Sequence, residues 1–165
     1  MVQGTIEKTA TLLIGAFILL CASVYVPDWD VVGLGLNSPV SARFIYSFIH
    51  ASFLHALLNT WCLVSIAFVY CLKWWQFIVA YIIAVGAPGF CLSTTPTVGL
   101  SVVCFALLGL IALSVSRRLY YNLWIGAYLV LGFLLPSVNG WIHLYSYVAG
   151  LMVGLLTMPI PCRKK

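Results

Sequence analysis

The chain alternates between six long apolar stretches and short polar segments. A transmembrane helix needs about 20 consecutive apolar residues to cross the hydrocarbon core of a bilayer, and each stretch comes close to that length. The expected spans are 9–26, 51–72, 74–92, 99–116, 120–136 and 141–158. The pattern therefore predicts an all-α membrane protein, a six-transmembrane-helix bundle that forms a single domain over residues 1–165.

Two segments at the start of the chain need separate interpretation. The first stretch is followed by "PDWD" rather than by a small-residue cleavage site, so we expect a retained helix and not a signal peptide. The segment 27–47 is the one long connection. It is amphipathic and contains Trp29 and Arg43, which predicts a segment that lies in the membrane interface.

Composition agrees with a membrane protein and excludes several other classes. Hydrophobic residues make up 64 % of the chain and charged residues 7 %, which cannot supply the polar exterior of a soluble domain. The net charge of +5 comes from basic residues scattered between apolar stretches, so no nucleic-acid partner is expected. The six cysteines show no C-x-x-C spacing, and we expect no metal site, no disulfide framework and no cofactor.

The positions of the basic residues predict the orientation in the membrane. Cytoplasmic segments of membrane proteins carry an excess of Lys and Arg. With the N-terminus inside, only Arg43 lies outside, and the other basic residues lie inside: Lys8, Lys73, Arg117, Arg118, Arg163, Lys164 and Lys165. Both termini are therefore expected on the cytoplasmic side. The expected location is a plasma membrane of the bacterial inner-membrane type.

On this topology the rare polar side chains gather at one depth. His50, His55 and Asn59 lie at the outer end of the second span, Ser101 at the outer start of the fourth and His143 at the outer start of the sixth. Polar and ionisable residues are costly in hydrocarbon and usually serve function there. An imidazole that takes the proton of a serine hydroxyl makes that hydroxyl a nucleophile. No Asp or Glu lies in a predicted span, so Ser101 and His143 are predicted to form a dyad.

Two further patterns support this hypothesis. His55 and Asn59 are four residues apart on one helix face, and both can donate hydrogen bonds to an oxyanion. The last span carries the small residues Ser146, Gly150 and Gly154 at four-residue spacing, and Gly109 lies on the fourth span. Small residues let membrane helices approach closely, which would place Ser101 beside His143.

Each pattern also has an ordinary structural interpretation. A serine in a membrane helix usually bonds its own backbone, and glycine ladders are mostly packing motifs. The sequence "VGLSVV" around Ser101 lacks the second glycine of an α/β-hydrolase nucleophile elbow. The coincidence of all these residues in one leaflet favours a functional site. A small transporter or channel would favour a broken helix near the midplane, where Pro88 is the one hint.

Taken together, the motifs resemble those of the rhomboid family of intramembrane serine proteases. "HASFLHALLN" matches the family pattern H-x4-H-x3-N, "GLS" at 99–101 resembles its G-x-S nucleophile segment, and "GWIHLYSYVAGLMVGLL" resembles its last helix. The resemblance covers nearly the whole chain in order. It implies a six-helix rhomboid-like bundle that cleaves transmembrane protein substrates within the lipid bilayer, and it leaves the oligomeric state open.

The resemblance also implies a role for each motif residue. Ser101 would be the nucleophile and His143 the general base. An oxyanion hole would be formed by His55, Asn59 and the backbone N–H of Ser101. His50 and Gly99 would support that hole.

The chain departs from the family pattern at several positions. Val102 stands where a small residue is usual, Phe105 replaces a frequent tyrosine, and Arg43 lacks the tryptophan that usually precedes it. A second alignment of the last span would put Tyr147 at the base position, which implies a catalytically inactive rhomboid-like protein that binds membrane helices. We favour His143, because it supplies an imidazole and keeps the small residues at the expected spacing.

Overall fold

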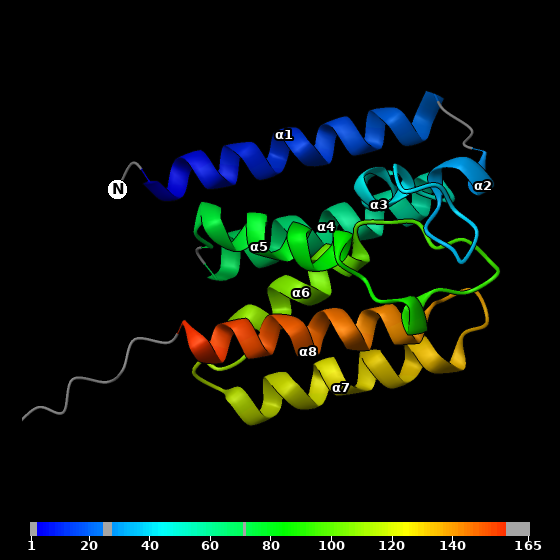
Figure 1. Ribbon diagram of the computed structural model, residues 1–165. Helices are drawn as coiled ribbons and strands as arrows, with labels where there is room; N and C mark the ends of the chain where they lie inside the picture. The colour runs from blue at the N-terminus through cyan, green and yellow to red at the C-terminus, as the bar shows by residue number, and fades with distance from the viewer. Residues whose placement is uncertain (1–2, 25–27, 71, 158–165) are drawn as a thin grey trace, which may run out of the picture.

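The computed structural model describes residues 3–24, 28–70 and 72–157, and within these ranges the chain is helical without a β-strand. The all-α prediction is thereby confirmed. Six helices of ten or more residues form a bundle (Figure 1), with short helical turns in its loops. The long helices are α1 (Gln3–Val24), α4 (Phe53–Tyr70), α5 (Trp74–Val85), α6 (Ser101–Ile111), α7 (Arg118–Leu134) and α8 (Gly140–Leu156). The short ones are α2 (Trp29–Val32), α3 (Ala42–Ile45), η1 (Tyr46–Phe48) and η2 (Gly89–Cys91).

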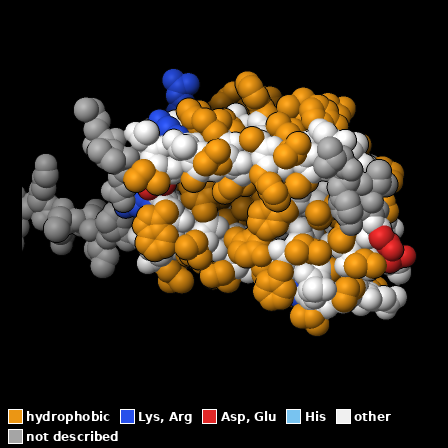
Figure 2. All heavy atoms as spheres, turned by 90° about the horizontal axis from the view of Figure 1, so that it is seen from above, with side chains coloured by type: hydrophobic (Ala, Val, Ile, Leu, Met, Phe, Trp, Pro, Cys, Tyr) orange, Lys and Arg blue, Asp and Glu red, His pale blue; other side chains and the backbone are white. Residues whose placement is uncertain are grey.

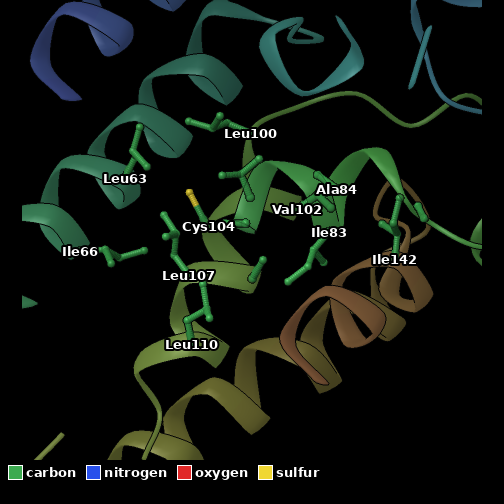
Figure 3. Packing of buried hydrophobic residues seen from close by; sticks show 14 of the residues in the cluster. Leu63, Ile66, Ile83, Ala84, Leu100, Val102, Cys104, Leu107, Leu110 and Ile142 are labelled. Carbon is green, nitrogen blue, oxygen red and sulfur yellow. The ribbon is translucent and has the colours of Figure 1, made fainter. Parts of the chain in front are cut away.

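Helix α6 lies at the centre of the bundle. It packs most extensively against α8 and also contacts α5 and α4, whereas α1 packs on the outside of α4 (Figure 1). Eight of its eleven residues are buried. The core around it is apolar and includes Leu63 of α4, Ile83 of α5 and Ile142 of α8 (Figure 3).

The outer surface of the bundle is apolar as well. Leu13 and Leu20 of α1 are 67 % and 63 % exposed, and large hydrophobic side chains cover most of the face seen in Figure 2. Such a surface suits hydrocarbon rather than water. Two helices, α1 and α4, have the length and hydrophobicity of a transmembrane helix, over Thr5–Ser23 and Phe53–Tyr70. The count of six spans stays a prediction.

Several predicted boundaries differ from the observed ones. The third stretch was expected to be helical over 74–92, but α5 ends at Val85, where Gly86 caps it and Pro88 follows. A proline disfavours helical backbone in the residue before it, so the helix cannot continue. The fourth stretch was expected over 99–116, but α6 covers only Ser101–Ile111, and turns follow it. Several predicted positions lie outside the described residues: 25–26 in the first span, 71 in the second, 158 in the last, and the basic residues 163–165.

Candidate active site

The Ser101 hydroxyl and the His143 imidazole are in direct contact. Ser101 is the first residue of α6, His143 lies in the first turn of α8, and the Oγ–Nε2 distance is 2.8 Å. The Phe105 ring, one turn further along α6, stacks on the imidazole with a centroid distance of 4.7 Å and an interplanar angle of 26°. This stacking fixes the plane of the ring, so Nε2 points at Oγ.

Glycines explain why α6 and α8 lie close enough for this contact. A Cβ atom built on Gly109 would overlap the backbone of Tyr147, and one built on Gly150 would overlap the backbone of Ala106. A Cβ on Gly154 would lie 2.5 Å from the carbonyl oxygen of Leu110. The expected close packing of the fourth and sixth spans is therefore observed, and the small-residue ladder allows it.

No carboxylate accompanies the dyad. The chain contains three acidic residues, of which Glu7 is part of α1 and the other two, Asp28 and Asp30, lie at α2. On the Nδ1 side of the imidazole stands Gly132 of α7, where a built Cβ would lie 3.7 Å from Nδ1. Any chemistry at this site is therefore that of a serine–histidine pair.

His55 and Asn59 face the peptide that precedes Ser101. Gly99 has a φ of 116°, a conformation that side chains other than glycine rarely adopt. A Cβ at Gly99 would lie 2.8 Å from Cε1 of His55 and 3.2 Å from Nδ2 of Asn59. Gly99 is thus required both by its backbone and by the two side chains that lie against it.

Both side chains present a donor at this place. Nδ1 of His55 accepts a hydrogen bond from the backbone N–H of Ala51 at 3.4 Å, so in the neutral ring the proton is on Nε2. Nδ2 of Asn59 is buried and has no acceptor among the described residues. As the first residue of a helix, Ser101 has no intrahelical partner for its own N–H. Two side-chain N–H donors therefore lie against Gly99, two residues before Ser101, and the N–H of Ser101 is a third.

The backbone before Ser101 is held by the first long connection. The N–H of Gly99 donates to the carbonyl oxygen of Tyr46 at 3.0 Å, and the N–H of Leu100 donates to Nε2 of His50 at 3.2 Å. Because Nε2 accepts, Nδ1 of His50 carries the proton and donates to the carbonyl oxygen of Phe48 at 3.3 Å. Burial, with a contribution from nearby His55, lowers the pKa of His50 to about 4, so the ring is neutral at pH 7.

The first connection is in turn attached to α5. One guanidinium nitrogen of Arg43 donates to the carbonyl oxygens of Val85 and Ala87, at 3.2 and 2.7 Å. The hydroxyl of Tyr46 donates to the carbonyl oxygen of Ala84 at 2.9 Å. Arg43, expected in the interfacial segment and as an outer-side charge, binds the carbonyl of Val85 at the end of α5 and that of Ala87 just beyond it. A helix leaves its last carbonyls unpaired. The connection is therefore a folded part of the site.

Asn139 is a residue that the sequence analysis missed. Its Oδ1 accepts the N–H of Ile142 and caps α8, while its Nδ2 donates to the carbonyl oxygen of Cys91 and to Oγ1 of Thr97, at 2.8 and 3.0 Å. These bonds fix the start of the helix that carries His143. The sequence signal that could have identified Asn139 is its position directly before an apolar run, because asparagine is a preferred N-cap residue.

The structure also places Val102, which departs from the family pattern, and Tyr147, the alternative base position. The Val102 side chain is fully buried in the core. Tyr147 donates its hydroxyl proton to Oδ1 of Asn122 on α7, whereas the hydroxyl of Ser101 pairs with His143. Within the described ranges no three His, Cys, Asp or Glu side chains cluster as a metal site requires.

Comparison with known protein families agrees with this arrangement. A family model described as Rhomboid domain matches residues 39–164, which is most of the chain. The chain belongs to the rhomboid family. Rhomboid proteins are integral membrane proteins and are generally intramembrane serine proteases that act on membrane protein substrates. Neither the comparison with curated proteins nor that with solved structures gives a significant match.

Proposed function

We propose that this rhomboid protein is an intramembrane serine endopeptidase that hydrolyses peptide bonds in or near the transmembrane segments of other membrane proteins. The observation that carries the proposal is the 2.8 Å distance between Ser101 Oγ and His143 Nε2. A serine hydroxyl within hydrogen-bond reach of an imidazole is the arrangement that nucleophilic catalysis needs.

The mechanism uses His143 as base and then as acid. Nε2 of His143 removes the Oγ proton as Ser101 attacks the scissile carbonyl, and the same proton passes to the leaving amine. Water then attacks the acyl-enzyme: His143 takes a proton from the water and returns it to Oγ of Ser101 as the carboxyl product leaves. Negative charge develops on the carbonyl oxygen during both attacks. Hydrogen-bond donors that are already held in place stabilise this charge and lower the activation barrier. His55 Nε2–H, Asn59 Nδ2–H and the N–H of Ser101 are assigned this role.

The proposed arrangement in the membrane follows from the basic residues. Lys73 and Arg117 lie at the end of the bundle opposite the dyad, beside the starts of α5 and α7. Positively charged segments remain in the cytoplasm, so the dyad would face the outer leaflet with both termini inside. In this proposal, residues 1–165 form one membrane domain with six spans, in a bacterial-type inner membrane.

The enzymatic test uses a fluorophosphonate probe and a model single-span substrate in detergent and in liposomes. Wild type should be labelled and should cleave, whereas Ser101→Ala and His143→Ala should lose turnover while remaining folded. Ser146→Ala is the matched control, because its hydroxyl only bonds the carbonyl oxygen of Ile142 on the same helix. Turnover that survives in either dyad variant would reject the mechanism.

The same experiment separates the proposal from an inactive rhomboid-like protein that only binds membrane helices. An inactive protein would capture the model substrate without cleaving it, and no label would depend on Ser101. For orientation, Ser93→Cys or Asn139→Cys in intact cells should react with a membrane-impermeant thiol reagent from outside. Reaction from the cytoplasmic side alone would overturn the topology.

A further inference from the structure

A hollow lies at the end of the bundle opposite the dyad. It is a cavity of about 1000 Å³ enclosed by the end of α4, the start of α5, the turns after α6, the start of α7 and the end of α8. Its wall inside the bundle is apolar and includes Leu108, Ile111 and Ile125. Neither Ser101 nor His143 lines it, so the proposed peptidase reaction does not use it.

The charged side chains that line this cavity are both basic. Lys73 and Arg117 line it, and the lining contains no Asp or Glu. Among the described residues, neither side chain is seen in an ion pair. Hydroxyl-bearing Ser114 and Ser116 and the amide of Gln76 add neutral polar groups to the same wall. The cavity therefore joins a positive polar mouth to an apolar interior.

Both basic residues lie at the N-terminal end of a helix, where a positive side chain is electrostatically least favourable. Lys73 is the N-cap residue of α5 and Arg117 is the N-cap residue of α7, and neither side chain makes a capping hydrogen bond to its helix. The N-terminal end of a helix carries partial positive charge and favours anions. Lys73 and Arg117 are exposed, and they place two positive charges at two such ends around one cavity. An anion bound between them would interact favourably with both side chains and with both helix ends.

The surroundings of the cavity select a lipid over a free anion. The aromatic side chains Trp75, Tyr120 and Trp124 line it, and such rings concentrate at the headgroup level of membranes. Val69, Leu110 and Val115 add apolar side chains to the lining. An inorganic phosphate would leave this apolar lining uncovered, whereas acyl chains would cover it.

We propose that this cavity binds an anionic phospholipid from the adjacent leaflet, with its phosphate contacted by Lys73 and Arg117 and its upper acyl chains against the apolar wall and α7. The headgroup would bind through charge and through the helix N-termini, and the chains through burial of apolar surface. The proposal does not depend on the catalytic role of the dyad.

The test is native mass spectrometry of the full chain in neutral detergent, titrated separately with phosphatidylglycerol and phosphatidylcholine. One phosphatidylglycerol should remain bound, with about tenfold or greater preference over the zwitterionic lipid. The same lipid should raise the thermal unfolding midpoint of the wild type. Equal binding of the two lipids, or displacement of phosphatidylglycerol by millimolar inorganic phosphate, would overturn the assignment.

Charge-matched variants separate this cavity from the general surface potential. Lys73→Gln with Arg117→Gln should weaken phosphatidylglycerol binding about tenfold or more and abolish its thermal shift. Lys8→Gln with Arg118→Gln removes the same charge from the same end, at residues that do not line the cavity, and should change binding less than twofold. Equal losses in the two pairs would contradict the proposal.

Two further variants cover the remaining outcomes. Ser116→Trp keeps both charges and fills the mouth of the cavity, so it should also weaken phosphatidylglycerol binding, even if the charge variants fail to fold. A chain that ends at Thr157 tests whether the following residues occupy the cavity instead. Lipid binding that appears only in this shortened chain would reject the site for the full-length protein.

Discussion

The imidazole of His50 accepts a hydrogen bond from the backbone N–H of Leu100, the residue that precedes the candidate nucleophile. His50 lies before α4 and Leu100 lies before α6, so the bond joins two segments that are 50 residues apart in sequence. Through this bond, His50 positions the backbone from which Ser101 begins.

The first prediction concerns this bond. His50→Leu should lower stability by about 1–3 kcal/mol, because it leaves a buried N–H of Leu100 without an acceptor. Fluorophosphonate labelling of Ser101 should slow as well. His50→Gln places an oxygen near the position of Nε2 and should recover much of both losses. Thermal unfolding and labelling rates in detergent measure the two effects. If His50→Leu and His50→Gln behave alike, His50 contributes through packing of its ring and not through the hydrogen bond.

The second prediction uses a pair of glycines from the same loop. Gly99→Ala should strongly reduce or abolish labelling of Ser101, because a Cβ there meets His55 and the φ of 116° strains any other residue. Gly89→Ala is the matched control, since a Cβ built there meets nothing within 4 Å. It should label and cleave like wild type. Near-normal cleavage by Gly99→Ala would mean that the positions of His55 and Asn59 against Gly99 are not required for catalysis.

The third prediction separates stability from rate at the proposed oxyanion donors. Asn59→Leu removes a buried Nδ2 that has no acceptor, so stability should be unchanged or higher. The rate of the chemical step should fall by about a hundred- to thousand-fold, as for other single oxyanion donors. His55→Ala should also be slow but measurable.

The control for Asn59 is the next residue on α4. Thr60 is buried and its Oγ1 also lacks a partner among the described residues. Thr60→Val should therefore raise stability in a similar way and leave single-turnover kinetics unchanged. If Asn59→Leu matches wild type in rate, the amide only fills space between helices and the oxyanion assignment is wrong.

The fourth prediction decides between His143 and Tyr147 as the base. Tyr147→Phe removes one hydrogen bond to Asn122 and should cost about 1 kcal/mol of stability while most activity remains. Asn122→Leu removes the other partner and also the bond from Nδ2 to the carbonyl oxygen of Arg118, so it should lose somewhat more stability and keep most activity. Turnover in a model-substrate assay is the readout. Loss of activity in Tyr147→Phe together with survival in His143→Ala would show that the assignment of His143 as the base is wrong.

The helices and the contact between Ser101 and His143 could be predicted from the sequence, because both depend on strong one-dimensional signals. Apolar stretches bounded by charges located all six long helices, and the ladder of Gly150 and Gly154 correctly predicted that α6 and α8 pack closely. The roles of His55 and Asn59 rest on four-residue spacing, and the structure places both beside Gly99.

The supporting contacts could not be predicted from sequence, because they join a backbone atom to a distant side chain. Neither Arg43 nor His50 shows by its neighbours in sequence that it binds a carbonyl or an N–H some 40 or 50 residues away. The early end of α6 is equally hidden, since Ala112 and Leu113, which follow it in turns, are good helix formers. Asn139 alone carried a local signal, its N-cap preference.

The shortness of α6 has a consequence for the electrical profile of the protein. Eleven residues of helix extend about 16 Å, roughly half of the hydrocarbon thickness of a bilayer, whereas the 17 residues of α8 extend about 26 Å. Where water reaches both ends of α6, the low-dielectric barrier along its axis would be thinner than that of the surrounding lipid. A transmembrane voltage would fall over this shorter distance, and the field along α6 would exceed the field in the bilayer beside it.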